Sequence, residues 1–191
     1  AVSVNVTYLG GGFGRRLEVD VIAQAVRVAL ETGGRPVQLA WSREEDFGHD
    51  FYRPAGVALL RGGLDAQGRL QALAATSAGD ALTPRWMERV LPALVAPFDL
   101  PDKLAVEGLF DLPYAVPHQR FAHVATTSGV PIGNWRSVGH SHNAFFSEGF
   151  VDELAHAAGH DPVRFRLEML ADMPRHAAVL RLPTDKAGWR G

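Results

Sequence analysis

The sequence Tyr8-Leu9-Gly10-Gly11-Gly12-Phe13-Gly14-Arg15-Arg16 joins two runs of different periodicity. Val2 to Tyr8 alternates apolar and polar residues, which is the pattern of a strand. Glu18 to Thr32 carries apolar residues at spacings of three and four, which is the pattern of a helix, and Gly33-Gly34 ends it. The chain is therefore predicted to open with a strand, a glycine-rich turn and a helix.

The glycine-rich turn has the composition of an anion-binding loop. Its glycines lack the Cβ atoms that keep a ligand away from the backbone. Free N–H groups before a helix, together with Arg15 and Arg16, suit a phosphate or a similar anion. The spacing is neither G-x-G-x-x-G nor that of a P-loop, so the local pattern equally favours a turn that only packs tightly.

The composition is that of a globular protein without thiol chemistry. Hydrophobic residues make up 47% and charged residues 21% of the 191 residues, which is enough for one large or two small domains. A net charge of −2 gives no overall field that would attract nucleic acid. Without cysteine, disulfides, thiolate metal sites and iron–sulfur ligation are excluded within the chain. No apolar run approaches the ~18 residues of a membrane-spanning helix, so no direct membrane insertion is expected.

The middle and the end of the chain alternate between strand and helix patterns. Ser42 and Asp161 have the residue types of helix N-caps, and Asp65 to Gly68 has the composition of a hairpin turn. Further strands are predicted at 37–41, 55–64, 69–78, 104–110 and 119–127. Further helices are predicted from 42, near 84–94, and at 141–158 and 163–171, before a loose tail rich in prolines and charges at 173–191.

This order of elements predicts an α+β fold with helices packed on mixed or antiparallel sheets. Hairpins, rather than repeated strand–helix–strand units, fill the middle of the chain. We expect one domain over residues 1–172, divided into two αβ lobes at about 1–53 and 54–172 and followed by the tail. Because the helix at 18–32 is apolar on most of its sides, we expect it to be buried on more than one face.

A second loop rich in glycine and polar residues, Ser128 to Gly139, precedes the helix predicted at 141–158. It contains Arg136, much as the first loop contains its arginine pair. Two helix N-termini that meet at one extended anion are a favourable arrangement, since each adds free N–H groups and partial positive charge. The prediction is that Phe13 and Arg136 lie side by side. The alternative is that Arg136 is an ordinary exposed loop arginine.

Four motifs in order resemble the molybdenum-binding subunit of the xanthine dehydrogenase and aldehyde oxidase family. They are Gly10–Arg16, the segment from Arg35-Pro36-Val37 to Arg43-Glu44-Glu45-Asp46, the loop Asn134-Trp135-Arg136-Ser137-Val138-Gly139, and Asp152-Glu153-Leu154-Ala155 with Gly159-His160-Asp161-Pro162. The collinear match runs to about Leu170. The second loop most resembles the isoquinoline 1-oxidoreductase and membrane-associated aldehyde dehydrogenase branch.

The resemblance implies that the chain is part of a molybdenum hydroxylase, which oxidises an aldehyde or an N-heteroaromatic substrate with oxygen taken from water. Its cofactor would be a molybdenum–pterin dinucleotide, commonly the cytosine form in bacteria. No side chain is expected to ligate the metal, and residues 141–143 would open a helix towards the cofactor. The residues implied to contact the cofactor are Gly11, Gly12, Phe13, Gly14, Arg15, Trp135, Arg136 and Ser137.

Two departures from the family pattern affect this expectation. Ser137 and Val138 stand where the family usually has glycine and an aromatic residue. The family's catalytic glutamate lies in a later glycine-rich segment that nothing after Leu170 matches, so no catalytic residue is assigned in this chain. We therefore expect a fragment of a larger subunit, without bound cofactor and inactive by itself.

The resemblance also implies partners for the chain. They are the rest of the large subunit, an iron–sulfur subunit and, as a further candidate, a cytochrome c subunit. The compartment of the parent enzyme stays open between periplasm, membrane surface and cytoplasm. The alternative function is a non-catalytic module that packs against partner domains and binds no small molecule. His140 and His142 add little to either hypothesis, because two alternating histidines make a poor metal site.

Overall fold

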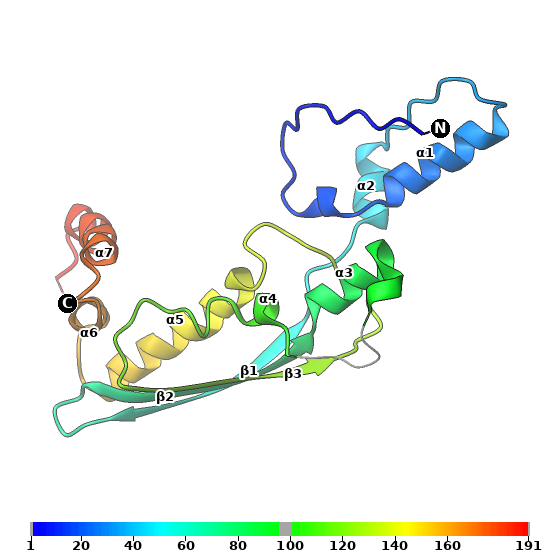
Figure 1. The fold of residues 1–191 in the computed structure, drawn as a ribbon. Helices are drawn as coiled ribbons and strands as arrows, with labels where there is room; N and C mark the ends of the chain where they lie inside the picture. Colours follow the sequence, from blue (N-terminus) through cyan, green and yellow to red (C-terminus); the bar gives the residue numbers. More distant parts are fainter. Residues whose placement is uncertain (1, 96–100, 191) are drawn as a thin grey trace.

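The computed structural model describes residues 2–95 and 101–190 (Figure 1). They form an α+β fold with seven α-helices and one mixed sheet of three strands. The strands are β1 (Gly56–Leu64), β2 (Leu70–Asp80) and β3 (His118–Thr126). The helices are α1 (Asp20–Glu31), α2 (Arg43–His49), α3 (Leu82–Val90), α4 (Lys103–Val106), α5 (His140–Ala157), α6 (Pro162–Met169) and α7 (Pro174–Ala187). In Figure 1, α1 and α2 lie towards one end of the long sheet, and α6 and α7 lie towards the other.

The sheet is a hairpin extended by a parallel strand. β1 and β2 pair in antiparallel orientation, as predicted, and the Asp65 carboxylate accepts the N–H groups of Gln67 and Arg69 at 2.9 Å each in the turn. β3 pairs in parallel with β2, with Phe121 opposite Ala75. A parallel pair needs a long connection between its strands, and here that connection contains α3 and α4.

Helix α5 covers one face of the sheet and contributes Val151, Leu154 and Ala155 to the core (Figure 1). Gly62 of β1 makes room for α5, because a Cβ at this position would lie 2.6 Å from a methyl carbon of Leu154. Val151 and Leu154 pack in one apolar cluster with Phe165 of α6 and Ala177 of α7. The sheet, α5, α6 and α7 therefore form one hydrophobic unit.

The two predicted strands before residue 53 do not form. Residues 2–9 and 35–42 have no regular secondary structure, and the side chains of Val2 and Val6 are 94% and 93% exposed. A strand is stable only when a neighbour completes its backbone hydrogen bonds, and the described residues offer no neighbour at these places. The prediction of two αβ lobes is therefore wrong: within the described residues, the one sheet lies after residue 55.

Helix α1 lies where the sequence predicts it, but the expected burial is wrong. None of its residues is buried, and the Leu30 side chain is 71% exposed. A hydrogen bond from Trp41 Nε1 to Gln24 Oε1, at 2.8 Å, connects α1 to the segment that precedes α2. An apolar helix becomes buried only where a second element covers it, and no described strand lies against α1.

The ends of the helices follow their capping residues. Ser42 Oγ accepts the Glu45 N–H at 3.1 Å, and the Asp161 carboxylate accepts the Arg164 N–H at 2.8 Å, so both predicted caps are confirmed. A cap that the sequence analysis missed is Asp102, which accepts the N–H of the second residue of α4 at 3.1 Å. Residues 104–110, predicted as a strand, consequently start within this helix.

The end of the chain also differs from the prediction. Residues 174–187 form α7 instead of a loose tail, with proline at the helix start and Gly188 in a left-handed conformation at its end. The domain boundary at residue 172 stays a prediction. Among the described residues, no helix combines the length and the apolar character needed to cross a membrane.

Candidate functional site

The two glycine-rich loops, residues 10–16 (the first loop) and residues 128–139 (the second loop), lie side by side. The Arg136 N–H donates to the Phe13 carbonyl oxygen at 2.8 Å. Gly14 has a φ of 91°, and a Cβ there would lie 2.3 Å from a carbonyl oxygen of the second loop. Glycine permits this contact where any other residue would clash. The prediction that Phe13 and Arg136 lie side by side is confirmed.

The glycines of the first loop have different roles. A Cβ at Gly11 would lie 2.6 Å from the Phe13 ring, so this glycine makes room for a neighbouring side chain. A Cβ at Gly10 would meet nothing within 4 Å. Within residues 2–95 and 101–190, no acceptor receives the N–H groups of residues 11–14. The loop therefore combines internal packing with free backbone donors, which are what an anion site needs.

The Arg15 guanidinium is held by two carboxylates. Its Nη atoms donate to both oxygens of Asp20, at 2.9 and 2.8 Å, and its Nε lies 2.7 Å from Asp50 Oδ1. The hydrogen bond with Asp20 raises the pKa of Arg15 above its ordinary value. Its Cζ also lies 5.5 Å from the ring centroid of Trp41. These partners neutralise the charge of Arg15, so its side chain supports the first loop and is not free to pair with an anion.

Arg16 and Arg136 keep free guanidinium groups. Both residues are exposed, and neither side chain has a polar partner in the described part of the chain. Trp135 Nε1 donates to the Phe51 carbonyl oxygen at 2.9 Å, which fixes its ring. One groove is lined by five of the predicted site residues, namely Gly11, Gly12, Phe13, Arg15 and Trp135. The other side of this groove comes from α2 and the segment before it.

The second loop bends sharply after Arg136. Ser137 and Val138 have φ angles of 72° and 42°, in the left-handed region that glycine adopts most easily. Ser137 stands where the resembling family usually has glycine, and it takes a glycine-like conformation. The predicted site residue Ser137 is therefore part of a strained bend.

A buried ion pair that the sequence did not reveal ties the first loop to α3. The Glu18 side chain is 2% exposed, and its two carboxylate oxygens accept from Arg89 at 2.6 and 2.8 Å. Arg89 also donates to the Ile132 carbonyl oxygen at 3.0 Å, within the second loop. Its Cζ lies 4.2 Å from the ring centroid of Phe51. No local pattern marks residues that are 71 positions apart and pair only after folding.

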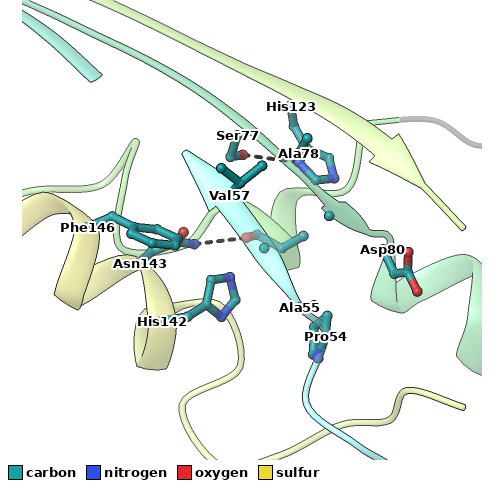
Figure 2. A pocket seen from close by; sticks show the side chains of 13 residues that line it. Pro54, Ala55, Val57, Ser77, Ala78, Asp80, His123, His142, Asn143 and Phe146 are labelled. Carbon is teal, nitrogen blue, oxygen red and sulfur yellow. Dashed lines mark hydrogen bonds between the residues drawn. The ribbon is translucent and has the colours of Figure 1, made fainter. Parts of the chain in front are cut away.

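Figure 2 shows a small pocket between the sheet and the first turn of α5. Ser77 of β2 and His123 of β3 meet there, with Oγ 3.2 Å from Nδ1. Asn143 is fully buried, and its Nδ2 donates to two carbonyl oxygens of the α4 segment at 2.9 Å each. Burial lowers the pKa of both His123 and His142, which favours their neutral rings at pH 7. This pocket shares no lining residue with the groove at the first loop.

The two histidines at the start of α5 have different surroundings. His140 Nε2 lies 3.5 Å from Asp111 Oδ2, whereas His142 lines the pocket in Figure 2. No group of three or more histidine, aspartate or glutamate side chains that could hold a metal ion occurs in the part of the chain that the structure describes.

Comparison with known families places this geometry in context. The family model for the molybdopterin cofactor-binding domain matches residues 1–170. The chain belongs to this molybdopterin cofactor-binding domain family. The resemblance to the molybdenum-binding subunits of the xanthine dehydrogenase and aldehyde oxidase family is thereby confirmed.

Two curated relatives match nearly all of this molybdopterin cofactor-binding domain. The chain is 30% identical over 190 residues to the beta subunit of isoquinoline 1-oxidoreductase from Brevundimonas diminuta, covering 99% of this chain and 24% of that protein. It is 31% identical to a membrane-bound aldehyde dehydrogenase (pyrroloquinoline-quinone) from Gluconacetobacter polyoxogenes, covering 95% and 25%. The chain thus spans about a quarter of the length of these relatives.

Solved structures show the same fold. Quinoline 2-oxidoreductase from Pseudomonas putida 86 matches with a TM-score of 0.64 and 21% identity, over 94% of this chain and 24% of that chain. The aldehyde oxidoreductase from Desulfovibrio gigas matches with a TM-score of 0.61 and 23% identity, over 84% and 16%. The arrangement of helices and strands is therefore shared with much larger chains.

Proposed function

We propose that this chain is the cofactor-binding part of the large subunit of a molybdenum hydroxylase. The proposed reaction is oxidation of an aldehyde or an N-heteroaromatic compound with oxygen taken from water. The family and the names of the two curated relatives, an isoquinoline oxidoreductase and an aldehyde dehydrogenase, support this proposal. The observation that carries it is the hydrogen bond from Arg136 to Phe13, which brings two distant loops to one site.

The residues at this site fit an oxygen-rich, anionic cofactor. The first loop offers N–H groups without acceptors in the described residues, and Arg16 and Arg136 offer guanidinium groups without carboxylate partners there. Fixed N–H donors stabilise negative charge without reorganisation, and guanidinium groups match phosphate geometry. When bound, the molybdenum–pterin group supplies the oxidation chemistry, with water as the source of oxygen.

Each predicted site residue has a proposed role towards this group. The backbone of Gly11, Gly12, Phe13 and Gly14 donates hydrogen bonds to it. Arg136 neutralises part of its charge, while Trp135 and Ser137 line the space beside it. Arg15 acts indirectly, because Asp20 and Asp50 fix its side chain under the first loop. We propose the cytosine dinucleotide form for the complete enzyme.

The proposed partners are the rest of the large subunit, an iron–sulfur subunit and a cytochrome c subunit. Exposed apolar side chains on α1, such as Ile22, Val26 and Leu30, support contact with further protein. They also favour the second candidate, a packing module that binds no small molecule. The two candidates differ in what they require of Arg136.

The test replaces Arg136 with alanine in the complete subunit and measures bound molybdenum and pterin by elemental analysis and absorbance. We expect cofactor content to fall about tenfold, as for the loss of a charge-assisted hydrogen bond in a desolvated site. Arg164→Ala, which removes an exposed arginine paired with Glu168 on α6, is the matched control and should retain the cofactor. Unchanged molybdenum in the Arg136 variant would favour the packing module.

A further proposal concerns the chain by itself. We expect the separate chain to bind no molybdenum and to reduce no dye in the presence of an aldehyde, since no catalytic residue is assigned in it. Metal analysis and a dye-reduction assay on the purified chain test this. Aldehyde-dependent turnover by the chain alone would contradict the proposal.

A further inference from the structure

The strained residues of this protein gather at one place. Among the described residues, the only non-glycine residues with positive φ are Phe13, Ser137 and Val138, at 49°, 72° and 42°. All three belong to the two loops in contact. The left-handed conformation is unfavourable for a β-branched residue such as Val138, and it persists only where the surroundings enforce it. The structure must therefore contain groups that hold the bend at Ser137 and Val138.

Both sides of this bend are fixed by the backbone. Before it, the Arg136 N–H is bound to Phe13, and the Val138 N–H donates to the Trp135 carbonyl oxygen at 2.9 Å. After it, Gly139 lies so close to α4 that a Cβ would come within 2.4 Å of the Leu104 carbonyl oxygen. The chain after the bend is thus packed tightly, and the Arg136 carbonyl oxygen accepts a long hydrogen bond from the Ser141 hydroxyl, at 3.4 Å, and a shorter one from a second partner.

Arg53 supplies that partner from the segment between α2 and β1. Its Nη2 donates to the Arg136 carbonyl oxygen at 3.2 Å, and its Nη1 donates to Ser141 Oγ at 3.0 Å. Its Cζ lies 5.4 Å from the ring centroid of Trp135. No carboxylate pairs with Arg53 within residues 2–95 and 101–190. One guanidinium therefore contacts residues before and after the bend and spans Ser137 and Val138.

We propose that Arg53 is a positioning residue, which holds the strained bend of the second loop and so presents Arg136 to the site. The importance of Arg136 for the cofactor rests on the proposed function above. The holding of the bend by Arg53, called the clamp below, rests on these contacts alone. Arg53 acts through the Arg136 carbonyl oxygen and needs no contact with the cofactor. The planar fork of arginine can bind two acceptors and stack on an aromatic ring, which the single ammonium of lysine does not reproduce.

The first experiment compares Arg53→Ala, Arg53→Lys and the matched control Arg164→Ala in the complete subunit. Hydrogen exchange of peptides covering residues 134–141 is followed by mass spectrometry. We expect exchange to become about tenfold faster in Arg53→Ala, less so in Arg53→Lys, and to stay unchanged in the control. Wild-type exchange rates in Arg53→Ala would overturn the proposal.

A second variant tests whether Arg53 holds the strained bend or only stabilises the fold in general. Ser137→Gly removes the steric strain at one position of the bend, because glycine has no Cβ and adopts positive φ without a clash. If Arg53 serves to hold the bend, Arg53→Ala should accelerate exchange less in the Ser137→Gly background than in the wild type. An equal acceleration in both backgrounds would contradict the clamp.

Molybdenum content distinguishes failure of this inference from failure of the proposed function. The inference and the proposed function are both supported if the wild-type subunit holds molybdenum and the Arg53→Ala variant exchanges faster and loses the metal. Faster exchange in a protein that never binds molybdenum supports the clamp and refutes the proposed function. Full molybdenum content together with unchanged exchange in Arg53→Ala refutes the inference alone.

Discussion

Helices α1 and α5 are both rich in apolar residues, yet only α5 is buried. Helix α5 lies on the sheet and hides Val151, Leu154 and Ala155, together with the polar Asn143 and Ser147. Helix α1 has no buried residue. Both helices carry apolar residues at helical spacing, and they differ in what lies against them. Apolar periodicity therefore gives the conformation of a segment, while burial and its stabilising free energy depend on a second element.

The largest expected effect compares one leucine from each helix. Leu154→Ala in α5 should lower the free energy of unfolding by about 3 kcal/mol, because it leaves a cavity against Gly62. Leu30→Ala in α1 should change it by less than about 0.5 kcal/mol, since that side chain is exposed. Urea unfolding of both variants measures the difference. Equal losses would show that α1 is covered in solution.

The next effect concerns the ion pair between Glu18, just before α1, and Arg89 of α3. Arg89→Ala should destabilise the chain by about 3 kcal/mol, because it leaves the buried Glu18 carboxylate without its partner. Glu18→Gln in addition should recover part of this loss, since a neutral amide is less costly to bury than an unpaired charge. Thermal unfolding of the single and double variants tests the pair. A double variant no more stable than Arg89→Ala would argue against it.

The smallest expected effect concerns the helix caps at Asp161 of α6 and Ser42 of α2, whose contributions to stability should respond differently to pH. Asp161 caps α6 as a carboxylate, and its hydrogen bond from the Arg164 N–H lowers its pKa below the ordinary 3.8. Its contribution, about 1 kcal/mol, is therefore present above pH 3.8 and is lost as the pH falls through the lowered value.

Ser42 caps α2 with a hydroxyl group, which carries no charge of its own. Hydrogen bonds from its own backbone N–H and from Ser42 lower the pKa of Glu44, so the cost of Ser42→Ala should change with pH only where Glu44 becomes protonated. Circular dichroism during acid titration of Asp161→Asn and Ser42→Ala checks both expectations. A pH-independent difference between Asp161→Asn and the wild type would contradict the assignment of the charged cap.

The candidate site was only partly predictable from the sequence. The motifs at Phe13 and Arg136 indicated the loops, and the structure brings them together. Arg15 was expected to be free for an anion, but Asp20 and Asp50 bind it. Arg53 went unnoticed, because an isolated arginine in a connecting segment carries no motif. Which cations are free depends on which carboxylates lie near them after folding, and the sequence does not contain those distances.

By itself, the sequence determined the features whose causes lie within a few residues. These are the hairpin between β1 and β2, the caps at Ser42 and Asp161, the position of α5 and the family motifs. Tertiary structure alone decided the parallel pairing of β3, the exposure of α1, the absence of a strand at 2–8 and the contact of Arg53 with Arg136. The reason is physical: turns and caps satisfy backbone groups locally, whereas ladders, burial and ion pairs need a partner that only the folded chain brings near.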